Sequence, residues 1–170
     1  IELDLRKPKL SAVFGISNRE TGITQYFINE KKAEEIIKPV PGQPNLHIIP
    51  SGPIPPNPSE LIMNGRLTEL LSHLDQHFDY ILIDTCPVSP VTDAYIISPL
   101  CDATLYIIRQ DVTPRFYLKK MDEHLKVKPL KNMAIVFNGI KAGGGKYGYG
   151  YGYGYGYGYT DDTQVKKRER

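Results

Sequence analysis

Residues Tyr80-Ile81-Leu82-Ile83-Asp84-Thr85 decide the fold class of this chain. The run up to Ile83 is continuously apolar, which is typical of a parallel strand that is covered on both faces. Asp84 follows it and is therefore expected at the carboxyl end of the strand, where open α/β sheets bind their ligands. This is the layout of a Walker B aspartate, which holds Mg²⁺ directly or through water beside a nucleotide. The alternative is an ordinary strand-end aspartate that caps the next turn.

Strands and helices alternate on either side of this stretch. Similar apolar runs predict four more strands, at Ile1–Asp4, Leu46–Pro50, Thr104–Arg109 and Met133–Asn138. Helices are predicted near Pro8–Phe14, Gly22–Lys38, Val91–Ser98 and Thr113–Leu125, besides one that follows Asn57. The alternation indicates an α/β fold in which a mainly parallel sheet lies between helical layers and right-handed crossovers join the strands.

The helix after Asn57 has the clearest pattern. Its apolar residues recur at helical spacing, at Leu67, Leu70, Leu71, Leu74 and Phe78. Asn57 is the expected N-cap, Pro58 suits the first helical position, and Glu60 would complete a capping box. The preceding residues, from Pro39 to Pro58, include eight prolines. They predict a rigid, irregular connection around one strand.

Composition narrows the function classes. The chain has 170 residues, of which 41% are hydrophobic and 24% charged, as in an ordinary globular domain. A net charge of +2 gives no argument for a nucleic-acid partner. Cys86 and Cys101 have no metal-ligand spacing, so both are predicted to be reduced thiols. No apolar run approaches the roughly 18–20 residues that a membrane-spanning helix needs.

A second pair of carboxylates lies near the first residue. Glu2 and Asp4 end a predicted strand, and alternate residues of a strand lie on one face about 7 Å apart. One of them could assist Mg²⁺ binding while the other accepts a hydroxyl proton, and Arg6 would supply positive charge near a transferring phosphate. The alternative is a charged strand exit with ion pairs in solvent.

Two further features concern nucleotide binding. Asn138 ends the last predicted strand, where its amide could read the adenine edge, although a turn-forming role before Gly139 is equally natural. The sequence contains no G-x-x-x-x-G-K-[ST] phosphate loop. Gly143-Gly144-Gly145-Lys146 is not one, because Ile140 replaces the first glycine and Tyr147 replaces the Ser or Thr.

The composition changes sharply after residue 141. Alternating tyrosine and glycine cannot build an apolar core, so residues 142–170 are predicted to be a disordered tail and residues 1–141 a folded domain. The tail offers seven phenol hydroxyls as phosphate acceptors, on Tyr147, Tyr149, Tyr151, Tyr153, Tyr155, Tyr157 and Tyr159. The alternative is an aromatic tail that associates by stacking.

The order of these motifs resembles the bacterial tyrosine kinases (BY-kinases) of capsule and exopolysaccharide synthesis. The resemblance covers nearly all of residues 1–140. The residues that carry it are Leu3–Pro8, Ser51–Leu61, Phe78–Thr85, Val91–Ala94, the strand that ends at Asn138 and the terminal tyrosines. The Ser-Gly-x-x-Pro-Pro-Asn-Pro-Ser-Glu segment is its most specific part.

The resemblance implies a three-layer α/β sandwich of the P-loop NTPase class, of the deviant Walker type found in partition and septum-site ATPases. Asp4 with Glu2 would form a second Walker A-like motif, Asp84 the Walker B motif, and ATP and Mg²⁺ would be the cofactors. It further implies phosphorylation of the tail tyrosines between neighbouring subunits of a homo-oligomeric ring. A membrane-anchored chain-length regulator, on the same or a separate chain, and a tyrosine phosphatase would be partners at the cytoplasmic side of the inner membrane.

Three departures from the family pattern stand out. Glu2 occupies a position that is usually Asp, and Cys86 one that is often Pro. The expected phosphate loop would precede Ile1, and the chain opens abruptly, so we expect a fragment that alone neither binds ATP well nor catalyses. Two other functions therefore stay open, a non-catalytic scaffold that is the substrate of such a kinase and a partition-type ATPase.

Overall fold

The first residues of the chain lie between two other segments. In this computed structural model, which describes residues 1–17, 21–88, 92–127 and 129–141, Glu2 pairs with Asp84 in a parallel bridge. The Leu3 amide donates to the Asp84 carbonyl at 2.8 Å, and the Asp84 amide donates to the Ile1 carbonyl at 2.9 Å. On the other edge, the Glu2 amide donates to the Ile49 carbonyl at 2.9 Å. The predicted strands Ile1–Asp4 and Tyr80–Thr85 were therefore wrong as full strands, since they meet in a single bridge, and Tyr80 and Leu82, at 88% and 76% exposed, are not covered on both faces.

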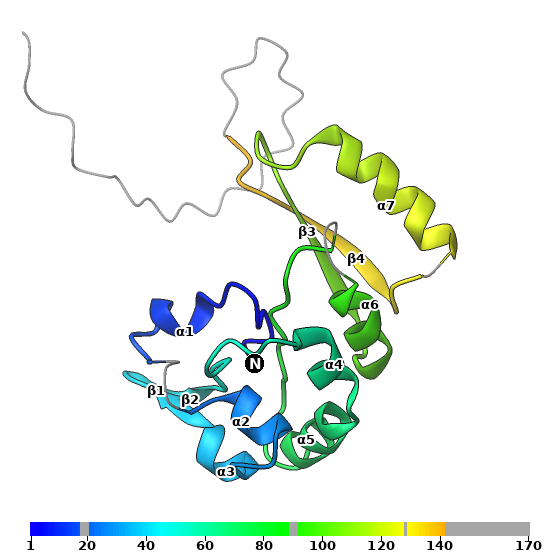
Figure 1. Ribbon diagram of the computed structural model, residues 1–170. Coiled ribbons are helices and arrows are strands. Elements are labelled where there is room, and N and C mark those ends of the chain that lie inside the picture. Colours follow the sequence, from blue (N-terminus) through cyan, green and yellow to red (C-terminus); the bar gives the residue numbers. More distant parts are fainter. Residues whose placement is uncertain (18–20, 89–91, 128, 142–170) are drawn as a thin grey trace, which may run out of the picture. The chain divides into compact units, whose positions relative to one another are not determined.

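The proline-rich connection forms a hairpin. Strand β1 (Lys38–Val40) pairs antiparallel with β2 (Gln43–Ile48), and Gly42 takes a positive φ of 74° in the turn between them (Figure 1). The predicted strand Leu46–Pro50 was wrong in its bounds. We also predicted that both of its faces are covered, but every residue of β2 except Ile48 is exposed. Prolines at strand edges and turns do not interrupt such a short ladder.

The predicted helix Gly22–Lys38 is broken in two. Helix α2 spans Ile23–Phe27 and α3 spans Ala33–Ile36. Asn29 between them has a left-handed φ of 62°, which a continuing helix cannot contain. The prediction of one helix was wrong because the apolar residues of both pieces keep a helical spacing across the break.

Helix α2 begins against the loop that follows β2. The Ile23 amide donates to the Pro50 carbonyl at 2.8 Å, and the Thr24 amide donates to the Ser51 carbonyl at 3.0 Å. At this contact a Cβ on Gly22 would lie 2.2 Å from the Gly52 nitrogen, so only glycine fits at position 22. Gly52 itself has a φ of +78°.

The helix after Asn57 is also divided. Helix α4 spans Pro58–Met63 and α5 spans Arg66–Leu74, with Gly65 at a φ of 84° between them. The capping box was wrong. The Asn57 side chain makes no bond to the helix backbone and instead donates from its amide nitrogen to a Glu60 carboxylate oxygen at 2.7 Å.

The predicted apolar face of α5 is confirmed by burial. Leu67 and Leu70 are 0% exposed and Leu74 is 3% exposed. They belong to a core formed with α2, α3, α4 and the N-terminal residues, whose largest members are Leu3, Leu5, Ile23, Tyr26, Phe27, Ile36, Ile49, Ile62, Leu67, Leu70, Leu74 and Ile97.

The remaining elements come closest to prediction. Strands β3 (Thr104–Arg109) and β4 (Met133–Asn138) have the predicted bounds and pair in parallel, with helix α7 (Arg115–Val127) between them in the chain. Helices α1 (Leu10–Val13) and α6 (Asp93–Ile97) are shorter than predicted, and a 3₁₀ turn (Ser98–Leu100) extends α6.

Both cysteines are free, as predicted. In the part of the chain that the structure describes, none of the helices has the length and apolarity to span a membrane.

Candidate functional site

Asp84 and the acidic N-terminal segment come together at the ends of adjacent parallel segments. The bridge to Glu2 fixes the Asp84 backbone, while its side chain remains exposed. Partial desolvation, followed by the negative charges of Asp4 and Glu2, raises the pKa of the Asp84 carboxyl. The three predicted carboxylates are thus close enough to repel one another, as expected of a site that attracts cations.

Glu2 is the most enclosed of the three, with an exposed fraction of 0%. Its Oε1 accepts a bond from the Ser11 amide at 3.2 Å. Its Oε2 accepts from the Ser11 hydroxyl at 2.7 Å and from the Ser51 amide at 3.1 Å. Burial opposes ionisation, but these donors outweigh it and lower the pKa of Glu2. In this arrangement the carboxylate ties α1 and the Ser51 loop to the N-terminal segment.

Asp4 is half-buried and organises the turn that follows it. Its Oδ1 accepts bonds from the backbone amides of Arg6 at 3.1 Å and Lys7 at 3.0 Å. Such bonds from an aspartate to amides two and three residues on define an Asx-type turn. The turn sets the direction in which the Arg6 side chain leaves the backbone.

Arg6 lies in a partly buried network that the sequence did not reveal. Its Nη2 donates to the Ser59 hydroxyl at 2.8 Å, and its Nε lies 3.4 Å from Asp93 Oδ2. The Ser59 hydroxyl in turn donates to Asp93 Oδ1 at 2.6 Å. Asp93 and Ser59 both fall in the motifs that carry the resemblance, but no local pattern marks them as partners of Arg6.

Cys86 completes this network. Its thiol donates to Asp93 Oδ2 at 3.5 Å, and its side chain is 4% exposed. Desolvation and the neighbouring Asp93 carboxylate raise the pKa of Cys86 to about 11. The thiol therefore stays protonated at neutral pH and serves as a hydrogen-bond donor, and it is a poor nucleophile.

Asn138 is engaged in its own turn. Its side-chain oxygen accepts a bond from the Gly139 amide at 2.7 Å, and Gly139 has a φ of 68°. This geometry matches the turn-forming alternative, and the adenine-reading role of Asn138 stays a prediction.

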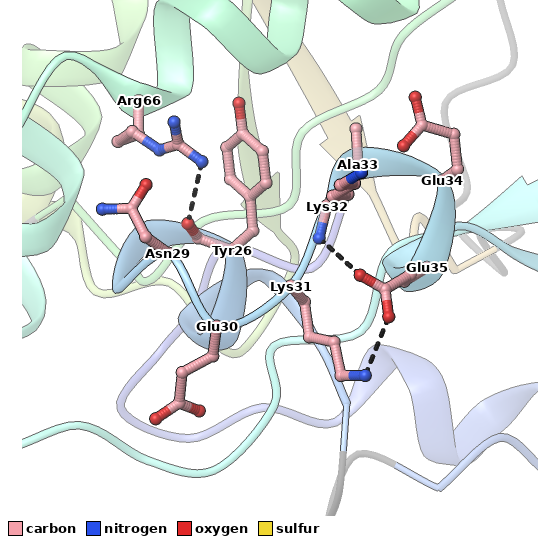
Figure 2. Close-up of a pocket in the computed structure, with 9 residues that line it drawn as sticks. All are labelled: Tyr26, Asn29, Glu30, Lys31, Lys32, Ala33, Glu34, Glu35 and Arg66. Atoms are coloured by element: carbon pink, nitrogen blue, oxygen red, sulfur yellow. Dashed lines mark hydrogen bonds and ion pairs between the residues drawn. The ribbon is translucent and has the colours of Figure 1, made fainter.

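A pocket of about 500 Å³ lies between the end of α2, α3 and the start of α5 (Figure 2). None of Glu2, Asp4, Arg6 or Asp84 lines it. Figure 2 shows one pair of charged side chains along its wall, where Lys31 Nζ lies 2.8 Å from Glu35 Oε1. The Arg66 guanidinium lies 4.2 Å from the centroid of the Tyr26 ring. These pairings engage part of its polar groups, whereas the buried Nε of Arg66 has no hydrogen-bond partner among the described residues.

Two predictions have no test in this geometry. Among the described residues, no group of three or more His, Cys, Asp or Glu side chains is arranged to hold a metal ion. The predicted Mg²⁺ ligands, Asp84 and Asp4, are only two carboxylates. The seven tail tyrosines lie outside the described residues.

Known proteins that are similar to the chain agree with one another. No protein-family model matches it. Tyrosine-protein kinase CpsD of Streptococcus agalactiae serotype III is 31% identical over 148 residues, which cover 87% of this chain and 63% of that protein. Tyrosine-protein kinase YwqD of Bacillus subtilis is 31% identical over 141 residues, which cover 83% and 59%. The chain therefore spans about three-fifths of the length of these two relatives.

Solved structures give the same result. The kinase domain of the Escherichia coli tyrosine kinase ETK matches with a TM-score of 0.76 and 29% identity, covering 89% of this chain and 59% of that one. The septum site-determining protein MinD of Pyrococcus horikoshii, solved with Mg-ADP, matches with a TM-score of 0.58 and 22% identity, covering 80% and 54%. At 22% identity the likeness to MinD shows the fold alone, and that fold is of the predicted α/β class. Sequence and structure agree that the chain belongs to the bacterial tyrosine-protein kinase family.

Proposed function

We propose that the chain is part of an ATP- and Mg²⁺-dependent protein tyrosine kinase that phosphorylates its own C-terminal tyrosine cluster. The observation that carries the proposal is the parallel bridge that joins Asp84 to the segment containing Glu2 and Asp4. It lies in a chain whose relatives are named tyrosine-protein kinases. The relatives are longer than this chain, so the activity is proposed for the whole protein.

The carboxylates of Asp84 and Asp4 fit Mg²⁺. This ion prefers oxygen ligands and usually takes one or two carboxylates together with substrate phosphates and waters. Asp84 is exposed and Asp4 half-buried, so both can be reached from solvent. Bound there with ATP, Mg²⁺ would neutralise the charge that develops on the transferred phosphoryl group.

The reaction assigns a role to each remaining side chain. A tyrosine oxygen forms a bond to the γ-phosphorus while the bond to the ADP oxygen breaks, and the phenolic proton passes to a carboxylate. Glu2 and Asp4 are the candidate acceptors: Glu2 could take the proton only by giving up its hydrogen bonds to Ser11 and Ser51, and Asp4 only while Asp84 alone binds Mg²⁺. Arg6 supplies positive charge beside the transferring phosphoryl group.

Asn138 is proposed to contact adenine. Its side chain would present a donor and an acceptor to the base only after its oxygen leaves the Gly139 amide. The proposed adenine contact does not depend on the acidic site. If it is disproved, the roles proposed for Asp84, Asp4 and Arg6 are unaffected.

The acceptors are proposed to be the tail tyrosines, Tyr147, Tyr149, Tyr151, Tyr153, Tyr155, Tyr157 and Tyr159. The residues from 142 to 159 span at most about 60 Å when fully extended, which is enough to reach the active site of a neighbouring subunit in a ring. Each phosphate would add roughly −1.5 to −2 charges, so phosphorylation would favour separation of the subunits. We propose that this cycle, reset by a tyrosine phosphatase, controls a membrane-bound chain-length regulator of capsule or exopolysaccharide synthesis.

The experiment that tests the proposal is peptide mass spectrometry of the tail. The full-length protein is stripped of phosphate and incubated with Mg²⁺ and ATP, as the wild type and as Asp84→Ala. The matched control is Asp75→Ala, which removes an exposed carboxylate at the end of α5. The proposal expects phosphate on Tyr147–Tyr159 in the wild type and in Asp75→Ala, and none in Asp84→Ala.

The other outcomes favour the alternatives. ATP hydrolysis with an unmodified tail would indicate a partition-type ATPase. No turnover by the full-length protein, together with phosphorylation of its tail by a separate kinase, would indicate a scaffold that serves as substrate.

A further inference from the structure

Asp93 is a buried charge whose partners come from three other segments. It is the first residue of α6, and its exposed fraction is 2%. A carboxylate removed from water in this way is tolerated only when several donors surround it. Its donors are the Ser59 hydroxyl at 2.6 Å, the Cys86 thiol at 3.5 Å and, as an ion pair, the Arg6 guanidinium at 3.4 Å.

Ser59 connects the same carboxylate to Arg6 by a second route. The Ser59 hydroxyl accepts a hydrogen bond from Arg6 Nη2 at 2.8 Å and donates one to Asp93 Oδ1 at 2.6 Å. Arg6 is therefore held by one hydrogen bond, from Nη2 to Ser59, and by an ion pair in which its buried Nε lies 3.4 Å from Asp93 Oδ2 without a hydrogen-bond partner among the described residues. A hydrogen bond and an ion pair on the same side chain restrict the guanidinium more than either would alone.

Arg6 follows Asp4 by two residues in the chain. The Arg6 amide donates to Asp4 Oδ1, so the backbone of Arg6 is set by Asp4 and its side chain by Asp93. A cation that is oriented before the reaction does not need to reorganise as charge moves, which is how fixed groups lower a barrier.

We infer that Asp93, together with Ser59, is a positioning residue that orients Arg6 beside Asp4 for phosphoryl transfer. The inference rests on the proposed kinase function. Asp93 touches neither substrate nor cofactor, and it acts only through Arg6. Cys86 contributes a third bond to Asp93 without taking part in the chemistry.

The first test measures proton exchange at the Arg6 side chain and does not depend on enzyme activity. In the isotope-labelled chain, the exchange of the Arg6 Nε proton with water is measured by NMR in the wild type, in Asp93→Asn and in Asp75→Asn. Asp93→Asn keeps the shape and an acceptor oxygen for Ser59 but removes the charge. The inference expects Arg6 exchange to accelerate about tenfold or more in Asp93→Asn and to stay unchanged in Asp75→Asn, whose carboxylate is exposed.

The second test measures kcat and the KM for ATP in the full-length protein. A positioning error of about 1 Å lowers a rate on the order of a hundredfold, so Asp93→Asn should lower kcat by roughly 10–100-fold with little change in KM for ATP. In an Arg6→Ala background, the same substitution should cause no further loss, because residues that act through one another are not additive. Where Asp93→Asn does not fold, Ser59→Ala breaks the indirect route and is expected to show a smaller effect of the same kind.

The two tests separate this inference from the proposed function. Unchanged Arg6 exchange in Asp93→Asn overturns the inference whether or not the protein is a kinase. So does a full additional loss of kcat from Asp93→Asn in the Arg6→Ala background. A wild type that transfers no phosphate overturns the proposed function instead, and the exchange measurement still decides whether Asp93 holds Arg6.

Discussion

Two parallel pairings in this chain are supported in opposite ways. The pairing of Glu2 with Asp84 is a single bridge, yet the neighbouring Leu3 and Leu5 are only 1% and 2% exposed. Strands β3 and β4 keep their register from Thr104 and Met133 to Arg109 and Asn138. On β3, however, Leu105 is 59% and Ile107 is 54% exposed.

The difference teaches that an unbroken ladder and a buried core are separate sources of order. A backbone hydrogen bond contributes only about 0.5–1.5 kcal/mol net, because it replaces a bond to water. Burial of an apolar side chain contributes about 1.5–3 kcal/mol. The acidic site is built on a pairing in which the segment of Leu3 and Leu5 lies on the core while Leu82 is 76% exposed, so the N-terminal segment should be more stable than β3.

The largest effect is expected from the core beneath the site. Leu70 is 0% exposed, and Leu70→Ala should lower the free energy of unfolding by about 2–5 kcal/mol because it leaves a cavity. Urea unfolding followed by circular dichroism measures the loss. Leu71→Ala, at a half-buried position on the same helix, is the matched control and should cost less. Equal losses for the two variants would contradict the picture of a one-sided core.

A second prediction concerns Glu2, whose three hydrogen bonds fasten the site to the core. Glu2→Gln places an amide beside donors and should cost about 1–3 kcal/mol. Because the pKa of Glu2 is lowered by folding, its stabilising contribution is complete above the usual glutamate pKa and is lost as the pH falls through the lowered value. Urea unfolding at several pH values should therefore show the gap between wild type and Glu2→Gln closing in acid. A gap that does not depend on pH would mean that Glu2 acts through shape alone.

The exposed pairing should respond less than the core. Ile107→Ala is expected to lower the free energy of unfolding by less than about 1 kcal/mol, because the side chain is already half in water. Ile108→Ala, at a 9% exposed position of the same strand, is the control and should cost more. A larger loss of unfolding free energy for Ile107→Ala than for Ile108→Ala, measured by urea unfolding, would contradict this comparison.

The smallest effect is expected at Asp84, and it has the opposite sign. Folding raises the pKa of this carboxyl, so its ionised form is less favourable in the folded chain than in the unfolded chain at neutral pH. Asp84→Asn should therefore raise Tm slightly at pH 7, and the gain should shrink as the pH falls through the raised pKa. Differential scanning calorimetry at pH 7, and at a pH below the raised pKa of Asp84, measures both values of Tm. A lower Tm at pH 7 would mean that the carboxylate supports the fold.

The sequence predicted those parts of the structure that short-range patterns determine. The bounds of β3 and β4 and the apolar face of α5 followed from continuous and helical spacing. The rule that parallel strands carry ligand sites at their carboxyl ends identified Asp84 as a candidate, but the bridge between Asp84 and Glu2 was not predicted. The break at Asn29 was missed, because its left-handed backbone conformation leaves no trace in the pattern of apolar residues.

The missed half of the site depends on contacts between distant residues. Ser59 is 53 positions from Arg6 and 34 from Asp93, and Ser51 is 49 positions from Glu2. No spacing rule relates such positions, since they meet only after the core has formed. The sequence could identify Asp84, Asp4 and Arg6 as candidates but not what holds them.

The close approach of Gly22 to Gly52 limits how this domain can be recombined. A side chain at position 22 would collide with the backbone of the loop that follows β2, and Gly52 holds a φ of +78° in that loop. Neither segment can be exchanged alone for one of different shape, although they are far apart in the sequence. In chimeras between relatives, the start of α2 and the loop after β2 must therefore come from the same parent, and crossover points belong outside the interval that they enclose.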